Sequence, residues 1–381
     1  MKVKLSDAFD LQMGKTPPRN DRECWGDGHK WISISDIGNV GKYIDITKEE
    51  ITDIGVSKSG IKVVPKGTVI MSFKLSIGKT AITAEDMYTN EAIMAFINKG
   101  RYEINTDYLY HMCKGIDWLA GTNKAVLGLT LNKATMSEKE IVIPSMAEQL
   151  HVVSVLDKMD ELIALRKEQL AKLDQLVKSR FIELFGDPVD NPKGWKKDKA
   201  ENYIDLLSGF PFDSSKYTES GVNICGGLII MPQRIEWGDC KHWCSIDGYE
   251  EYALNENDIV IALDRPWISE GFKIAMVEAE HLPALLIQRT ARIRAIGLNQ
   301  FYLMYCFLLG GFDKHCNVTG SLVPHISAKD IRSFAIMLPP IDLQEQFAAF
   351  VEQTDKSKLA IQQSLDKLEL LKNSLMQDYF G

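Results

Sequence analysis

The stretch SRFIELFGDP, residues 179–188, is nearly repeated by NSLMQDYFG, residues 373–381. Superposing the two Phe-Gly pairs places Gly186 on Gly381, an offset of 195 residues (381 less 186). The same offset runs backwards without a gap. The matched pairs along it include Pro144 and Pro339, Gln149 and Gln344, Asp160 and Asp355, Leu170 and Leu365, and Ser179 and Ser374. A repeat of this period is far longer than a solenoid unit and indicates two copies of a domain with an arm.

The repeat continues upstream of these arms. Residues 131–144 match residues 326–339 in apolar pattern, and Gly14 of QMGKTP falls on Gly209 of LSGFPF. Between these anchors the offset drifts by a few residues, as insertions in loops would cause. The whole chain is therefore interpreted as a tandem duplication.

Each copy begins with short β-branched runs broken by Gly, Pro and Asn, and a helical segment follows late, at 106–114 and at 299–309. This pattern predicts an α+β domain in each copy. We expect a first globular domain (domain 1) at 1–143, a central helical arm at 144–186, a second globular domain (domain 2) at 187–338 and a C-terminal helical arm at 339–381.

The arms lack internal Gly and Pro, and their apolar residues recur every three or four positions, which predicts long amphipathic helices. Gly186 and Pro188 mark a helix stop. We expect the two helices to pair as an antiparallel coiled coil with pseudo-twofold symmetry; the alternative is that each stripe packs on its own domain. The predicted helix-helix seam comprises Leu156, Met159, Ile163, Leu170, Leu173, Val177, Val351, Ile361, Leu365, Leu368 and Leu375.

The composition, with 45% hydrophobic and 25% charged residues, is that of an ordinary folded protein. No apolar run approaches the roughly 18 residues of a membrane span. We therefore expect a cytoplasmic chain that does not contact a membrane. Its seven cysteines are an odd number, which favours free thiols over a disulfide framework.

Motifs of catalysis and metal binding are weak. The tripeptide Gly-Lys-Thr occurs at 14–16 and at 78–80, but a P-loop needs a further Gly five residues earlier, where Phe9 and Phe73 stand. CKHWC, residues 240–244, offers only one loose cysteine pair, whereas structural zinc sites use matched pairs. We predict no catalytic residue and no metal site, so an ATP- or metal-dependent enzyme is the third hypothesis.

The arms suggest a spacer. About thirty well-patterned helical residues make a rod of about 45 Å, and half-sites read from one face of B-DNA lie about 34–36 Å apart. The chain has the same order of parts twice: a variable domain, then Pro-x-x-x-x-Gln, then a long helix that ends in Phe-Gly. This order resembles the DNA-specificity subunit of type I restriction-modification enzymes. The segments that carry the resemblance are residues 143–170 and 338–355, together with the domain openings at Gly14 and Gly209.

This resemblance implies a non-catalytic subunit in which each globular domain reads one half of a bipartite target in double-stranded DNA. The helices would set the gap and dock two methyltransferase subunits. It implies no cofactor in this chain, because S-adenosylmethionine, ATP and Mg would be bound by the methyltransferase and by the endonuclease/translocase subunits. The alternative function is a coiled-coil scaffold that binds proteins only.

Cations on loops and turns near small or aromatic residues are the candidates for DNA contact, because Lys and Arg can address guanine or phosphate. The net charge of −8 gives no global sign of nucleic acid, although domain 1 taken alone is nearly neutral. The predicted DNA-binding residues are Lys15, Arg19, Arg22, Lys30 and Lys74 in domain 1, and Arg234, Lys241, Arg265 and Lys273 in domain 2.

Overall fold

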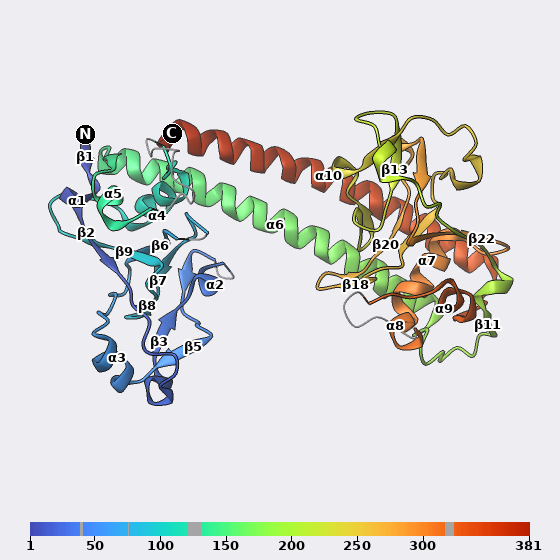
Figure 1. The fold of residues 1–381 in the computed structure, drawn as a ribbon, viewed down its shortest axis with the longest axis horizontal. Helices are drawn as coiled ribbons and strands as arrows, with labels where there is room; N and C mark the ends of the chain where they lie inside the picture. Colours follow the sequence, from blue (N-terminus) through green and yellow to red (C-terminus); the bar gives the residue numbers. More distant parts are fainter. Residues whose placement is uncertain (39–40, 75, 121–130, 317–323) are drawn as a thin grey trace. The chain divides into compact units, whose positions relative to one another are not determined.

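The structure is a computed structural model that describes residues 1–38, 41–74, 76–120, 131–316 and 324–381. These residues divide into two compact units, one formed by residues 1–167 and 363–381 and the other by residues 168–362. Two long helices, α6 (Met146–Phe185) and α10 (Ile341–Phe380), each contribute to both units (Figure 1). The boundaries between domains and arms that the sequence suggested, after residues 143, 186 and 338, stay a prediction.

The larger sheet of unit 1 has five strands in the order β2-β9-β6-β7-β4. These strands are β2 (Phe9–Met13), β9 (Ile93–Asn98), β6 (Val69–Ser72), β7 (Thr80–Thr83) and β4 (Tyr43–Ile44). All residues of β6 and β7 are buried, as expected for central strands that are covered on both faces. Helix α4 (Thr106–Gly115) shares one core with this sheet and matches the segment predicted at 106–114.

A second sheet of unit 1 has three strands in the order β5-β3-β8. They are β5 (Glu49–Ile51), β3 (Trp25–Ile32) and β8 (Tyr88–Thr89), accompanied by the helices α2 (Ile34–Ile37) and α3 (Asp53–Ser59). Within this unit, β3, β5 and α3 lie at the opposite end of the domain from α4 (Figure 1). The remaining elements are α1 (Leu5–Ala8), α5 (Lys133–Ser137) and the pair β1 (Lys2–Lys4) and β10 (Glu140–Val142).

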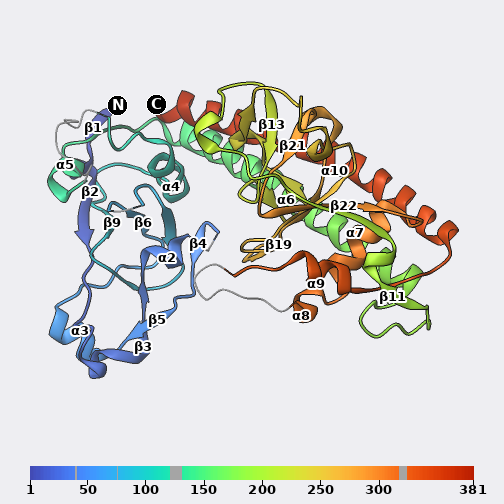
Figure 2. The ribbon, with the colours of Figure 1, turned by 45° about the vertical axis from the view of Figure 1, so that its right-hand side comes forward.

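Unit 2 repeats this plan. Its larger sheet has the order β12-β22-β17-β20, and a smaller sheet has the order β16-β13-β21. The strands are β12 (Ile204–Ser208), β22 (Thr290–Ala295), β17 (Ile259–Ala262), β20 (Ile274–Met276), β16 (Lys241–Trp243), β13 (Val222–Cys225) and β21 (Ala284–Leu286). Helix α7 (Gln300–Leu309) lies beside β22 in both views (Figure 1, Figure 2).

Shorter elements complete unit 2. The strands β11 (Lys197–Lys199) and β23 (Ala335–Met337) pair with each other, as do β14 (Ile230–Met231) with β15 (Arg234–Ile235) and β18 (Trp267–Ile268) with β19 (Gly271–Phe272). The short helices are α8 (Phe312–His315) and α9 (Ala328–Ser333). The mixed helix and sheet fold with two repeated domains, which the sequence predicted, is therefore present.

The paired glycines of the duplication stand where the backbone leaves no room for a side chain. A Cβ atom on Gly14 would lie 2.0 Å from the Thr89 carbonyl oxygen, and one on Gly209 would lie 1.9 Å from the Ile287 carbonyl oxygen. Each glycine follows the first strand of its larger sheet, β2 or β12. The two copies therefore require glycine for the same reason, which is the close approach of two backbones.

The paired glutamines join each arm to its domain. Gln149 and Gln344 are only 0% and 1% exposed. The side-chain oxygen of Gln149 accepts from the Asn105 backbone N–H at 2.8 Å, and that of Gln344 accepts from the Asn299 backbone N–H at 3.0 Å. Because each Asn is the N-cap of α4 or α7, each glutamine ties the first turn of an arm to the start of a domain helix. We call these contacts the glutamine latches.

The two Phe-Gly endings also occupy matching sites. Phe185 packs on Tyr302 of α7 in unit 2, with ring centroids 4.7 Å apart. Phe380 packs on Tyr108 of α4 in unit 1, with ring centroids 5.5 Å apart. Each ending thus contacts the domain that its own arm does not follow. This exchange gives a structural reason why the chain repeats this short sequence.

Candidate nucleic-acid interface

Two predicted DNA-binding cations of domain 1 are held by neighbouring groups. The Lys15 ammonium donates to the carbonyl oxygens of Ser59 and Gly60, both at 3.1 Å, and so satisfies acceptors at the end of α3. The Arg19 guanidinium lies 4.0 Å from the ring centroid of Trp25 and pairs with Glu49. Both cations therefore already have partners within the folded protein. DNA would have to displace these partners in order to bind Lys15 or Arg19.

Two further candidates are neutralised by carboxylates. Lys30 pairs with Glu85, and this carboxylate raises the pKa of the Lys30 ammonium. Arg234 pairs with Glu236 at 2.9 Å and with Glu270 at 3.2 Å. All of these groups are at least one-third exposed, so the ion pairs add little stability and can exchange for phosphate.

The other five candidates have no ion pair among the residues that the structure describes. Arg22 lies in a short 3-10 helix (Arg22–Cys24), Lys241 lies on β16, and both are exposed. Lys74 lies 5.3 Å from the ring centroid of Phe73. Arg265 follows β17, is exposed, and has a φ of 44°. The assignment of the nine residues as DNA contacts stays a prediction.

Lys273 differs from the other candidates because it is buried. Only 6% of the residue is exposed, and its ammonium donates to the carbonyl oxygen of Gly227. Burial and the neighbouring Arg265 guanidinium lower the pKa of the Lys273 ammonium. The sequence did not predict this burial, because the Gly227 carbonyl that accepts from the Lys273 ammonium lies 46 residues earlier in the chain.

The predicted seam residues lie on the covered sides of α6 and α10. Each of the eleven is buried or partly buried, and Leu156 and Val177 are 0% exposed. In unit 1, Lys167 pairs with Glu369 at 2.9 Å, and Lys372 pairs with Asp160. In unit 2, Lys358 pairs with Asp174 at 2.7 Å. Ion pairs therefore join the two helices within each unit, and the apolar helix-helix seam stays a prediction.

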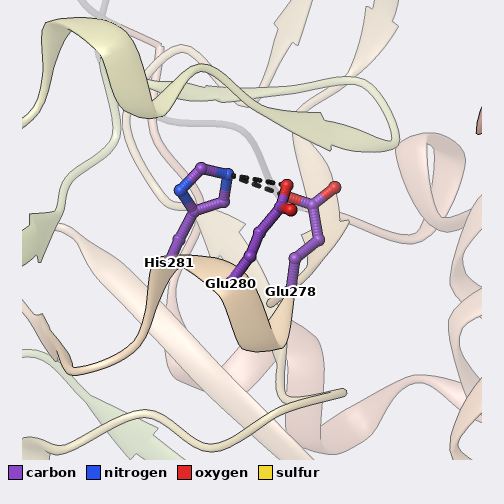
Figure 3. Close-up of side chains that lie close together, drawn as sticks. All are labelled: Glu278, Glu280 and His281. Carbon is purple, nitrogen blue, oxygen red and sulfur yellow. Dashed lines mark ion pairs between the residues drawn. The ribbon is translucent and has the colours of Figure 1, made fainter. Parts of the chain in front are cut away.

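One group of three possible metal ligands occurs in the described part of the chain. Figure 3 shows Glu278, Glu280 and His281 with their polar atoms close together. His281 Nε2 lies 3.6 Å from the Glu278 carboxylate and 3.3 Å from the Glu280 carboxylate. The imidazole ring stacks on Trp237 at a centroid distance of 5.3 Å. The arrangement is that of an ion-paired surface turn, and the predicted lack of a metal site stays a prediction.

The CKHWC segment does not form a closed ligand set among the described residues. The Cys240 sulfur lies 3.8 Å from His242 Nε2, but Cys244 is exposed and has no described partner in this group. All seven cysteines are free thiols, as the odd count predicted. Of the described helices, none has an apolar stretch long enough to cross a membrane.

A duplicated mixed domain, with a helical arm after each copy and cations on the loops of both, defines a class of tandem recognition protein. A family model described as the type I restriction modification DNA specificity domain matches residues 1–175 and 245–371. The chain belongs to this family. Its relatives are specificity subunits, which are the non-catalytic components of restriction-modification complexes, so the predicted family and the predicted lack of catalysis are confirmed.

Similar proteins match along nearly the whole length. The specificity subunit of the type I restriction enzyme MjaIX of Methanocaldococcus jannaschii is 25% identical over 409 residues, which covers 98% of this chain and 90% of that protein. A chain from a study of complex assembly in the type I R-M system aligns with a TM-score of 0.61 and 19% identity, covering 100% of this chain and 97% of its own. The S subunit of M. genitalium aligns with a TM-score of 0.52 and 13% identity, covering 100% and 96%. These two structures support the fold.

Proposed function

We propose that this chain is the sequence-reading subunit of a type I restriction-modification complex and that each globular domain reads one half of a bipartite DNA target. The observation that carries the proposal is the duplication itself. Two domains with matching glycines and glutamine latches can address two half-sites, and loops that differ between them can address different bases. Family membership and the cations on loops of both domains support DNA as the ligand.

The arms would set the gap between the half-sites. In unit 1 the ion pairs join residue 160 to residue 372 and residue 167 to residue 369, so the two helices run in opposite directions there. Each arm has 40 helical residues, a length of about 60 Å. We propose that the helices pair as an antiparallel coiled coil with pseudo-twofold symmetry and act as a spacer, since rigid helices hold a fixed distance.

The arms would also dock two methyltransferase subunits, and an endonuclease/translocase would join this assembly. Six leucines of the two helices are exposed, although each helix also has buried residues. They are Leu150, Leu165, Leu176, Leu359, Leu370 and Leu371. Exposed apolar side chains on the arms are candidates for contact with a protein partner. S-adenosylmethionine, ATP and Mg would be bound by these partner subunits.

Methylation mapping tests the proposal. DNA from cells that carry the chain and its cognate methyltransferase should contain a methylated motif with two short fixed blocks around a fixed gap. A chain truncated after Gly186 should lose this motif or give a symmetric one. If the methylated sites do not depend on the chain although the methyltransferase is active, the proposal fails and the protein-only scaffold, which the family relationship does not favour, becomes the better hypothesis.

A further inference from the structure

Several loops of unit 2 meet at one end of its larger sheet. Lys273, which directly precedes β20, donates its ammonium to the Gly227 carbonyl in the loop after β13. Its backbone N–H donates to the Pro266 carbonyl at 2.7 Å, in the loop after β17. Arg289, which precedes β22, pairs with Asp264 of that same loop. We call this set the basic edge; it comprises residues 226–228, Asp264, Arg265, Lys273 and Arg289.

The positive charge of Lys273 is not compensated within the described part of the chain. The residue is 94% buried, since 6% of it is exposed, and the partner of its ammonium is a neutral carbonyl oxygen. The Asp264 carboxylate of the same set is bound by Arg289, and after burial the like charge of Arg265 also lowers the pKa of the Lys273 ammonium. Burying an ammonium near a second cation disfavours the folded state. The stability of the fold therefore does not explain why a lysine occupies position 273.

The backbone of the basic edge is also unusual. Arg265 has a φ of 44° and Arg289 a φ of 63°, a conformation that costs energy for residues other than glycine and that gathers at functional sites. Leu228 is 92% exposed, directly after two glycines. The Leu228 side chain therefore does not contribute to the core, and a ligand can contact it without a change in the packing of the domain.

Unit 1 has a lysine at the equivalent place. Lys79 precedes β7 as Lys273 precedes β20, and the carbonyls of both lysines accept from the preceding strand: from Ser72 at 2.9 Å and from Ala262 at 3.1 Å. The Lys79 ammonium lies 2.7 Å from the site where Gly38 would carry a Cβ atom, in the loop after β3 and α2. Each lysine thus reaches toward the loop that follows the equivalent strand, β3 or β13, although these loops differ in sequence.

We propose that the basic edge is the DNA contact face of domain 2, where Lys273 and Arg265 bind one backbone phosphate and Leu228 lies against a base edge. The inference rests on the proposed function and names the surface that performs it. A phosphate supplies the negative charge that the buried ammonium lacks. A lysine at the same backbone position in both copies, exposed in unit 1 and buried in unit 2, fits the phosphate, which all targets share, and the different loops fit the bases.

The phosphate contact is tested with Lys273→Met in the full-length chain. The probes are a duplex that contains the methylation motif of the wild-type complex and a duplex of scrambled sequence, each titrated at several salt concentrations. We expect binding of both duplexes to weaken by about tenfold, as for one lost charge-assisted hydrogen bond. The slope of log affinity against log salt should decrease in magnitude by about one. Lys199→Met, which removes an exposed surface lysine of the same unit and changes the net charge equally, should leave slope and affinity unchanged.

Stability separates this role from a structural one. If the role of Lys273 is to bind DNA, Lys273→Met removes an uncompensated buried charge that the fold does not need. The melting temperature should then stay equal or rise, while DNA binding weakens. A variant that melts at a clearly lower temperature, or one that binds DNA with the wild-type salt slope, overturns the phosphate site.

The base contact is tested with Leu228→Ser. Affinity for the scrambled duplex and the melting temperature should not change, whereas discrimination among single-base variants of the half-site read by domain 2 should change at least about fivefold, since one apolar base contact is worth about 1 kcal/mol or more. Unchanged discrimination at every base of that half-site overturns this contact. Should the wild-type complex methylate a bipartite motif while these variants behave as wild type, the inference fails and the proposed function stands.

Discussion

Replacing Gln149 by Met should loosen the start of the first arm from domain 1. Methionine has a similar length and volume, so the substitution removes hydrogen bonds with little change in packing. Gln149 accepts from the Asn105 N–H at 2.8 Å and donates to the carbonyls of Glu103 at 2.9 Å and Pro144 at 3.1 Å. Because Gln149 is 0% exposed, water cannot replace these partners without local opening.

The expected cost follows from these three bonds. A buried N–H left without an acceptor costs about 1–3 kcal/mol, and each of the two lost bonds to a carbonyl adds about 0.5–1.5 kcal/mol, so we expect a loss of about 2–6 kcal/mol. Local opening should therefore become at least about 30-fold more frequent. Amide hydrogen exchange measured by mass spectrometry should show this as faster exchange at residues 103–113, at the start of α4.

A matched pair of variants gives the control. Gln344→Met should accelerate exchange at residues 299–309 in unit 2 and leave residues 103–113 unchanged, because each latch serves its own domain. Gln363→Ala, at an exposed site of α10, should change neither segment. If Gln149→Met exchanges as slowly as Gln363→Ala at residues 103–113, the latch does not hold the arm and the reasoning from buried hydrogen bonds is refuted.

Three further predictions concern stability. Burial lowers the pKa of the His111 imidazole, so the folded chain binds a proton at His111 less readily than the unfolded chain does. The free energy of unfolding should therefore fall as the pH drops below about 6.5. Urea titrations of His111→Gln should show a weaker dependence of this free energy on pH. Phe185→Ala should lower the free energy of unfolding by about 3–5 kcal/mol, because Phe185 is 0% exposed. Phe380→Ala should lower it by less, because Phe380 is partly exposed. Equal losses of stability for the two variants in thermal unfolding would contradict this order. Arg294→Met leaves the carboxylate of Asp258, which is 3% exposed, without its guanidinium partner. The free energy of unfolding measured in denaturant should fall by about 3–5 kcal/mol. A loss below about 1 kcal/mol would show that this ion pair does not stabilise the fold.

The duplication could be predicted from the sequence because its markers are local. Gly14 and Gly209 are required by backbone contacts, and the arms have a periodicity that a helix imposes on every turn. The glutamine pair was visible as a repeated spacing, but its partners were not, because Asn105 lies 44 residues from Gln149. Long-range hydrogen bonds leave no periodic pattern in a sequence.

The candidate interface was predicted less well, for a physical reason. Whether a cation is free depends on distant carboxylates: the partner of Arg19 is 30 residues away, and that of Lys30 is 55 residues away. The burial of Lys273 depends on a loop that lies 46 residues earlier. Residue type and neighbours in sequence identify a possible contact, but only the fold decides which charges are already neutralised.

The exchanged Phe-Gly endings have a consequence for synthesis of the chain. Unit 1 contains residues 1–167 but also residues 363–381, so its core lacks the Phe380 ring until the last turn of α10 has left the ribosome. At about 5–20 residues per second, the ribosome needs roughly 10–40 seconds to make the intervening segment. During that time the α4 surface around Tyr108 is uncovered. Of the two domains described, the one that is made first is therefore completed last, and a frameshift within the codons for α10 would damage it directly.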